Sequence, residues 1–178
     1  MMSEQPSSYR VSQLAGLLFE LGTTDLIDDI IRRWDVYERI RQFTHSELVQ
    51  AGTLVLNMVC EQNTKFYTVE LLAEDEPDLV LPFLLESLHS TYPDVRRWSC
   101  GILAETGSLQ AANRLMYILA YDPSADVRVV AAYALGRIGD PRAIPALMHA
   151  IEKDYEQDFE GIKVSDEAEE AIKRIRCK

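Results

Sequence analysis

Apolar residues recur at helical spacing along most of this chain, and short polar breaks separate the helical segments. The clearest segment covers residues 126–151, DVRVVAAYALGRIGDPRAIPALMHAI. Its first half has the three- and four-residue apolar intervals of a helix with one buried face, at Ala131, Ala134, Leu135 and Ile138. Gly139 suits the left-handed position that ends a helix, and Asp140-Pro141 suits the start of the next one. The segment therefore predicts two consecutive antiparallel helices.

The same pattern occurs 32 residues earlier, in YPDVRRWSCGILAETGSLQAANRLMYIL. Matching positions pair Asp126 with Asp94, Val127 with Val95, Arg128 with Arg96, Leu135 with Leu103, Gly139 with Gly107, Leu147 with Leu115 and Ile151 with Leu119. Asp94 and Asp126 are predicted to be the N-caps of the two first helices. A weaker copy covers residues 64–90, and residues 164–175 match a first helix without a second one after it. Such periodicity predicts a stack of repeated helical pairs.

This repeat resembles the HEAT-like repeats first associated with phycobilisome lyases, most clearly in the two copies that begin at Asp94 and Asp126. The resemblance implies an all-α, right-handed α–α superhelix of the HEAT-like or armadillo type, with about three repeats. The expected repeats are residues 63–91, 92–122 and 123–154, with a partial repeat at 163–176. It also implies that Arg96 and Arg128 have a structural role, pairing with acidic residues between repeats.

The first part of the chain is helical but does not follow the repeat. Residues 1–8 are expected to be disordered, and residues 9–62 to form an N-terminal helical cap for the stack. The expected helices run from Val11 to Leu21, from Thr23 to about Phe43, and from Thr44 to about Cys60. Thr44 and Glu47 have the spacing of a capping box at the start of the third helix. The alternative for these helices is a dimerisation module.

Charge argues against binding to nucleic acids, since 29 acidic and 18 basic residues give a net charge of −11. The arginines of the second helix, except Arg41, follow acidic residues by four positions, as Asp35 precedes Arg39, which favours ion pairs on a solvated helix face. The most apolar run, residues 51–60, is about half the length that spans a bilayer. The three cysteines are isolated, without a CxxC pair. A cytoplasmic protein without membrane segments is expected.

No catalytic residues, metal ligands or cofactor site are predicted. The chain lacks the His-Glu dipeptides that hold iron in the HEAT-like deoxyhypusine hydroxylases. Its charge also disfavours the basic groove of the HEAT-like alkylpurine DNA glycosylases. Glu86 and His89 have a spacing found in di-iron bundles, as do His149 and Glu152 in reverse order, but two repeats separate the pairs. Ordinary exposed side chains are the favoured interpretation.

The predicted function is non-catalytic binding of a protein partner, of unknown identity, on the concave face of the stack. Second helices of successive repeats line that face, and their outward positions supply the candidate binding residues. These are Phe83, Glu86, Arg114, Tyr117, Tyr121, His149 and Lys153. An alternative for Tyr117 and Tyr121 is simple packing against a neighbouring helix. The alternative function, implied by the resemblance alone, is a bilin lyase subunit or a chaperone-like factor for phycobiliprotein chromophore attachment.

Overall fold

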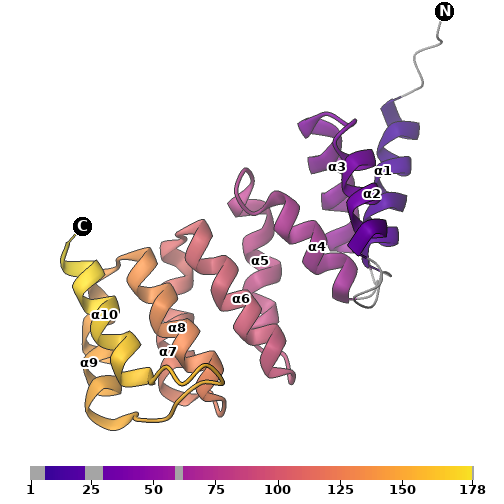
Figure 1. The fold of residues 1–178 in the computed structure, drawn as a ribbon. Helices are drawn as coiled ribbons and strands as arrows, with labels where there is room; N and C mark the ends of the chain where they lie inside the picture. The colour runs from indigo at the N-terminus through magenta and orange to yellow at the C-terminus, as the bar shows by residue number, and fades with distance from the viewer. Residues whose placement is uncertain (1–6, 23–29, 59–61, 178) are drawn as a thin grey trace, which may run out of the picture. The chain divides into compact units, whose positions relative to one another are not determined.

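The computed structural model describes residues 7–22, 30–58 and 62–177, which form helices joined by short loops (Figure 1). An isolated β-bridge between Gln157 and Lys163 is the one β feature of these residues. The predicted all-α class is therefore confirmed. The chain divides into two compact units, Met1–Val80 and Leu81–Lys178, each described here by itself.

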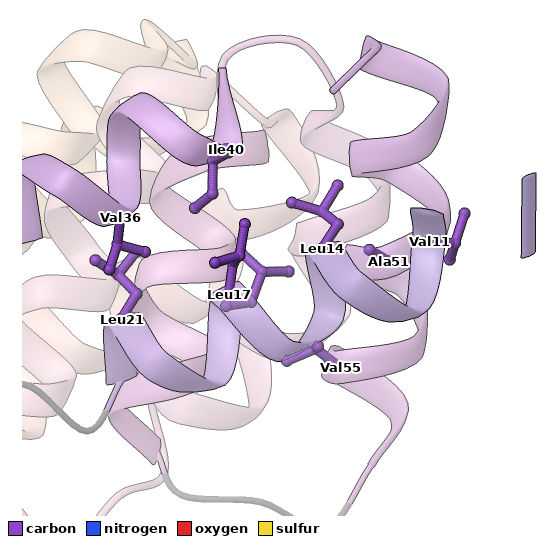
Figure 2. Packing of buried hydrophobic residues seen from close by; sticks show 9 residues of the cluster. Val11, Leu14, Leu17, Leu21, Val36, Ile40, Ala51 and Val55 are labelled. Atoms are coloured by element: carbon purple, nitrogen blue, oxygen red, sulfur yellow. The ribbon is translucent and has the colours of Figure 1, made fainter. Parts of the chain in front are cut away.

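In the first unit, α1 (Ser7–Gly22) packs against α2 (Ile30–Ile40), α3 (His45–Asn57) and α4 (Gln62–Leu72). Apolar side chains from α1, α2 and α3 form its buried core, part of which is shown in Figure 2. The core residues are Val11, Leu14, Leu17, Leu18, Leu21, Val36, Ile40, Ala51 and Val55. The burial of one apolar stripe per helix explains why the sequence pattern found these elements.

The start of α3 is the capping box predicted from the sequence. The Thr44 hydroxyl accepts a hydrogen bond from the Glu47 backbone N–H, and the Glu47 carboxylate accepts one from the Thr44 backbone N–H at 2.8 Å. Arg10 on α1 donates from Nε to the same carboxylate at 2.6 Å. This guanidinium, together with the Thr44 backbone N–H, lowers the pKa of Glu47 to about 2. The cap of α3 is thus tied to α1 by a charged pair.

Three limits of the expected N-terminal helices differ from the structure. The first helix begins at Ser7 rather than near Val11, the second ends at Ile40 rather than near Phe43, and the third ends at Asn57 rather than near Cys60. Residues 1–6, the expected start of the second helix at Thr23, and Cys60 lie outside the described residues.

In the second unit, α6 (Pro93–Thr106), α8 (Ala125–Ile138) and α10 (Val164–Arg176) lie side by side (Figure 1). We call them the first-helix layer. Behind them, α7 (Ala112–Tyr121) and α9 (Ile144–Lys153) pack against each other and form the second-helix layer. The boundary between the units falls within α5 (Pro77–Ser87), whose last residues belong to the second unit. This is the predicted solenoid arrangement of stacked helical pairs.

The ends of the repeated helices follow the sequence pattern, with one correction. Gly107 and Gly139 end α6 and α8 in the left-handed conformation, at φ 64° and 80°. Asp94 and Asp126, predicted as N-caps, instead lie in the first helical turns. The prediction was wrong because each helix starts earlier, at a residue directly after its N-cap, Tyr92 or Ser124.

Close contact between helices explains the small residues of the repeat. A Cβ atom placed on Gly136 of α8 would lie 2.7 Å from Cα of Ala171 on α10. The buried Ala131, Ala132 and Ala134 also keep α8 thin where its neighbours pack. The close approach of α8 to its neighbours therefore depends on residues with little or no side chain.

Candidate protein-binding surface

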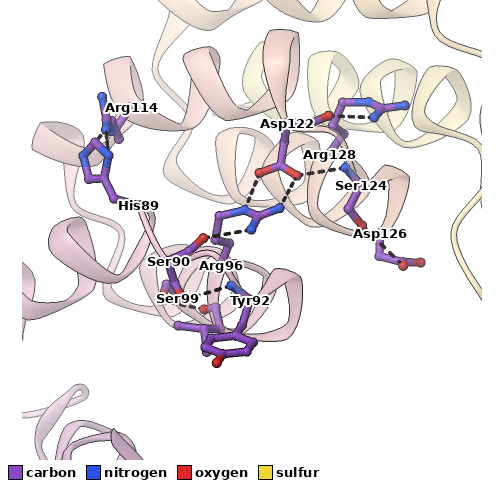
Figure 3. Close-up of polar contacts among 11 residues, drawn as sticks. His89, Ser90, Tyr92, Arg96, Ser99, Arg114, Asp122, Ser124, Asp126 and Arg128 are labelled. Atoms are coloured by element: carbon purple, nitrogen blue, oxygen red, sulfur yellow. Dashed lines mark hydrogen bonds and ion pairs between the residues drawn. The ribbon is translucent and has the colours of Figure 1, made fainter.

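A ladder of arginine contacts fixes the second-helix layer to the first (Figure 3). Arg96 on α6 donates to both carboxylate oxygens of Asp122, at 2.6 and 2.8 Å, and Asp122 is the C-cap of α7. The third guanidinium nitrogen of Arg96, Nη1, donates to the backbone carbonyl of Ser90 at 2.8 Å. Both charged side chains are nearly buried, with exposed fractions of 9% for Arg96 and 2% for Asp122. This bidentate contact holds the end of α7 at one place.

The next repeat contains the same set of contacts, shifted by one repeat along the chain. Arg128 on α8 donates to Asp154, the C-cap of α9, at 2.6 and 3.1 Å, and to the backbone carbonyl of Asp122 at 2.8 Å. Arg128 also donates to Glu156 at 2.9 Å. Arg96 and Arg128 pair with acidic residues as predicted, but the capping aspartates belong to the arginines' own repeats, so the predicted pairing between repeats was wrong in that respect. Each arginine joins a carboxylate of its own repeat to a carbonyl of the preceding one.

Three of the predicted binding residues share one face of α7. Tyr117 and Tyr121 are 55% and 70% exposed, and their ring centroids lie 5.0 Å apart. The guanidinium of Arg114 lies over the Tyr117 ring, 5.5 Å from its centroid, and contacts the imidazole of His89. More than half of each tyrosine is thus open to solvent, which does not fit the alternative of packing against a neighbouring helix.

Two hollows of the second unit border this face. The first, which we call the α5–α7 hollow, has a volume of about 420 Å³ and is lined by Leu85, His89, Gln110, Asn113, Arg114 and Tyr117. The second, the α7–α9 hollow, has a volume of about 460 Å³. Tyr121, His149 and Lys153 line it together with the ladder residues Asp122, Arg128, Asp154 and Glu156.

The structure therefore brings five of the seven predicted residues to two neighbouring hollows. Arg114 and Tyr117 line the α5–α7 hollow, while Tyr121, His149 and Lys153 line the α7–α9 hollow. The other two lie on α5 and line neither: Phe83 is half-buried, and Glu86 is exposed. Whether these residues bind a partner stays a prediction.

Sequence reasoning missed several lining residues. Leu85, Gln110 and Asn113 were not expected, because alignment of the second helices selects outward positions and not the walls between helices. Asp122 and Asp154 were also missed, although they lie 32 residues apart, at equivalent positions of the repeat. That spacing was a signal that could have found them.

The acidic connector after α9 is a folded loop. Asp158 accepts hydrogen bonds through its carboxylate from the backbone N–H groups of Glu160 and Ile162, at 3.0 and 2.8 Å. The backbone N–H of Phe159 donates to the Asp126 carboxylate on α8 at 2.8 Å. The Arg97 guanidinium lies over the exposed Phe159 ring, 5.3 Å from its centroid. Local and longer-range bonds together hold the loop against the first-helix layer.

Several further groups of the chain bear on other kinds of chemistry. Within the described ranges, no three His, Cys, Asp or Glu side chains gather in a way that could hold a metal ion. Burial raises the pKa of the Cys100 thiol to about 12, so this thiol is a poor nucleophile. Arg39 and Arg41 pair with acidic neighbours, Asp35 and Glu38, at 3.5 and 2.7 Å. None of the helices in the described part of the chain combines the length and apolarity needed to cross a membrane.

Comparison with known proteins agrees with this architecture. A search of curated proteins returned no match. The family model for HEAT repeats matches residues 81–161, which cover α6 to α9 and the connector that follows them. HEAT repeats stack helical pairs and present extended surfaces to other proteins. Residues 81–161 of the second unit are thus similar to HEAT repeats.

Proposed function

We propose that this protein is a non-catalytic interaction scaffold that binds a partner protein on the second-helix layer, the face expected to be concave. The binding residues are those of α7 and α9 that border the two hollows: Arg114, Tyr117, Tyr121, His149 and Lys153. Phe83 and Glu86 on α5 extend the proposed surface.

One observation carries this proposal: two exposed tyrosines and a partly exposed arginine lie together on one helix. Tyrosine and arginine are the residue types that most often dominate binding energy at protein interfaces. Adjoining exposed aromatic rings are typical of interaction sites, and here the two rings are 55% and 70% exposed. The Arg96–Asp122 contact fixes the helix that carries them, so little ordering is needed on binding.

Affinity capture from the native host tests the proposal. The tagged full chain is compared with a variant that carries Arg114→Glu, Tyr117→Ala and His149→Glu. The matched control carries Arg137→Glu and Arg176→Glu, which reverse two exposed charges of the first-helix layer. We expect a defined protein to be retained by the wild type and the control and lost from the triple variant, with all three showing the same helical circular dichroism.

Retention of the same partner by the folded triple variant would place the binding surface elsewhere. The alternative function, a role in bilin attachment, rests on the sequence resemblance and makes a different prediction. Under that alternative, the purified protein would carry a tetrapyrrole with visible absorption or would retain a phycobiliprotein subunit.

A further inference from the structure

The charge of α7 differs from that of the other helices. The chain has 29 acidic residues among 178, and every other α-helix of the described part contains at least one. α7, with the sequence ANRLMYILAY, contains none and carries Arg114. A local positive charge therefore lies on a protein with a net charge of −11.

Arg114 has no carboxylate partner among the described residues. Its contacts are the His89 imidazole and the face of the Tyr117 ring, neither of which carries a negative charge. This differs from Arg96 and Arg128, whose guanidinium groups are satisfied by carboxylates. Lys153, exposed in the α7–α9 hollow, likewise lies in no ion pair within the described part of the chain. Both cations are available to an anion from outside.

Apolar surface adjoins this unpaired charge. The Tyr117 and Tyr121 rings contact each other at a tilt of 49°, and Leu85 contributes to the wall beside them. Arg114 and Tyr121 are seven positions apart on α7, which corresponds to about 10 Å along the helix axis. An extended peptide covers that distance with roughly three residues.

We propose that the partner presents an acidic segment to this face, with one carboxylate on Arg114 and an apolar or aromatic side chain about three residues away on the Tyr117–Tyr121 pair. A second acidic residue beyond the apolar one reaches Lys153. Charge complementarity selects this occupant, because a basic segment would bring like charges together at Arg114. This inference rests on the proposed function and specifies the chemistry of the partner.

A random peptide library displayed on phage tests the inference without knowledge of the partner. The full chain is the bait, and the variants are Arg114→Glu and the double change Tyr117→Ala with Tyr121→Ala. Arg176→Glu on α10 is the control, since it changes the net charge of the chain by the same amount as Arg114→Glu. We expect the wild type and the control to select peptides in which Asp or Glu lies about three residues from an aromatic or aliphatic residue.

The strongest peptide is then synthesised with its acidic residue intact and with Glu→Gln or Asp→Asn in its place. Fluorescence anisotropy should show the amide form binding the wild type roughly tenfold more weakly than the acidic form. In Arg114→Glu this preference for the carboxylate should be lost or reversed, because the new carboxylate repels the acidic peptide. If Arg114→Glu no longer prefers the acidic peptide over its amide form, the peptide carboxylate binds Arg114 in the wild type.

The remaining outcomes separate the two proposals. Peptides that depend on the tyrosines but show no acidic preference would overturn the inference and leave the proposed function standing. Peptides that bind the arginine and tyrosine variants as well as the wild type, or selection of no peptide above the variant background, would overturn both.

Discussion

At the scale of single residues, Arg96 and Asp122 depend on each other for burial of their charges. Replacing Asp122 by Ala leaves the Arg96 guanidinium nearly buried without a carboxylate, and we expect a loss of about 3 kcal/mol in the free energy of unfolding. Asp154→Ala should cost about 1 kcal/mol, because Asp154 is more exposed and Glu156 still pairs with Arg128. Urea denaturation followed by circular dichroism measures both, and equal losses would contradict this account.

Two glycines inside helices provide a second test, because replacing each by alanine should change the stability in opposite directions. Gly136→Ala adds a methyl group against Ala171 and should destabilise the protein by about 2 kcal/mol. Gly101→Ala on α6 meets nothing within 4 Å and should stabilise it by about 0.5–1 kcal/mol through better helix propensity. Thermal unfolding of the two variants checks the pair. A stabilised Gly136→Ala would mean that α8 and α10 are not in close contact.

At this scale the sequence revealed the arginines that recur in the repeat, but it did not reveal their carboxylate partners. Arg96 and Arg128 were recognised from the repeat, since both copies contain Asp-Val-Arg. Their carboxylate partners lie 26 residues further on, beyond a turn and a second helix. Helical periodicity describes neighbours within one helix, so contacts of this length follow only from how the helices pack.

At the scale of one element, the cap of α3 makes its stability depend on pH. The pKa of Glu47 is lowered to about 2, below its ordinary value of 4.5, so its contribution is fully present above pH 4.5 and is lost as the pH falls toward 2. The stability difference between the wild type and Glu47→Gln should therefore shrink over that range. Urea denaturation at several pH values measures it.

The Arg10→Met variant is the control for this pH dependence. Arg10 is the main cause of the lowered pKa, so its removal should move the loss to higher pH. An unchanged profile in Arg10→Met would assign the effect to another carboxylate.

The connector loop of residues 154–163 is the second element with a direct test. Asp158→Ala removes the acceptor of two backbone N–H groups, and we expect amide hydrogen exchange at Glu160 and Ile162 to become at least about fivefold faster. Glu160→Ala is the control, because the Glu160 side chain is exposed and accepts no hydrogen bond that holds the loop. Equal exchange in both variants would mean that the loop is held by other contacts.

Among the elements, the paired helices and the α3 cap could be predicted from sequence because their signals are local. The ordered loop could not. Its composition is polar and charged, which is equally typical of a mobile segment, and its order depends on Asp126, more than 30 residues away in sequence. The candidate surface falls between these cases: outward positions on α7 were predicted, whereas its hollows depend on the spaces between helices.

At the scale of the whole molecule, the net charge of −11 opposes the approach of an acidic partner that Arg114 holds once bound. Added salt screens both effects. For the acidic peptide selected from the phage library, we therefore expect the association rate constant and the dissociation rate constant both to rise between low and physiological ionic strength. Stopped-flow fluorescence measures the two rates. An association rate that falls with salt would indicate that local attraction dominates the approach.

The Arg–Asp ladder also bears on how such a chain can grow or be engineered. Each repeat contributes an arginine, a capping aspartate and a backbone carbonyl that accepts from the next arginine. A duplicated copy of residues 93–124 would therefore carry all the donors and acceptors that these contacts need on both sides. In α10 the arginine's place is taken by Ser165, whose backbone N–H donates to the backbone carbonyl of Asp154. Insertion of whole modules between α7 and α8 would thus repeat the arginine contacts and leave the close α8–α10 contact unchanged. The length of the stack could therefore change by duplication without new contacts having to be designed.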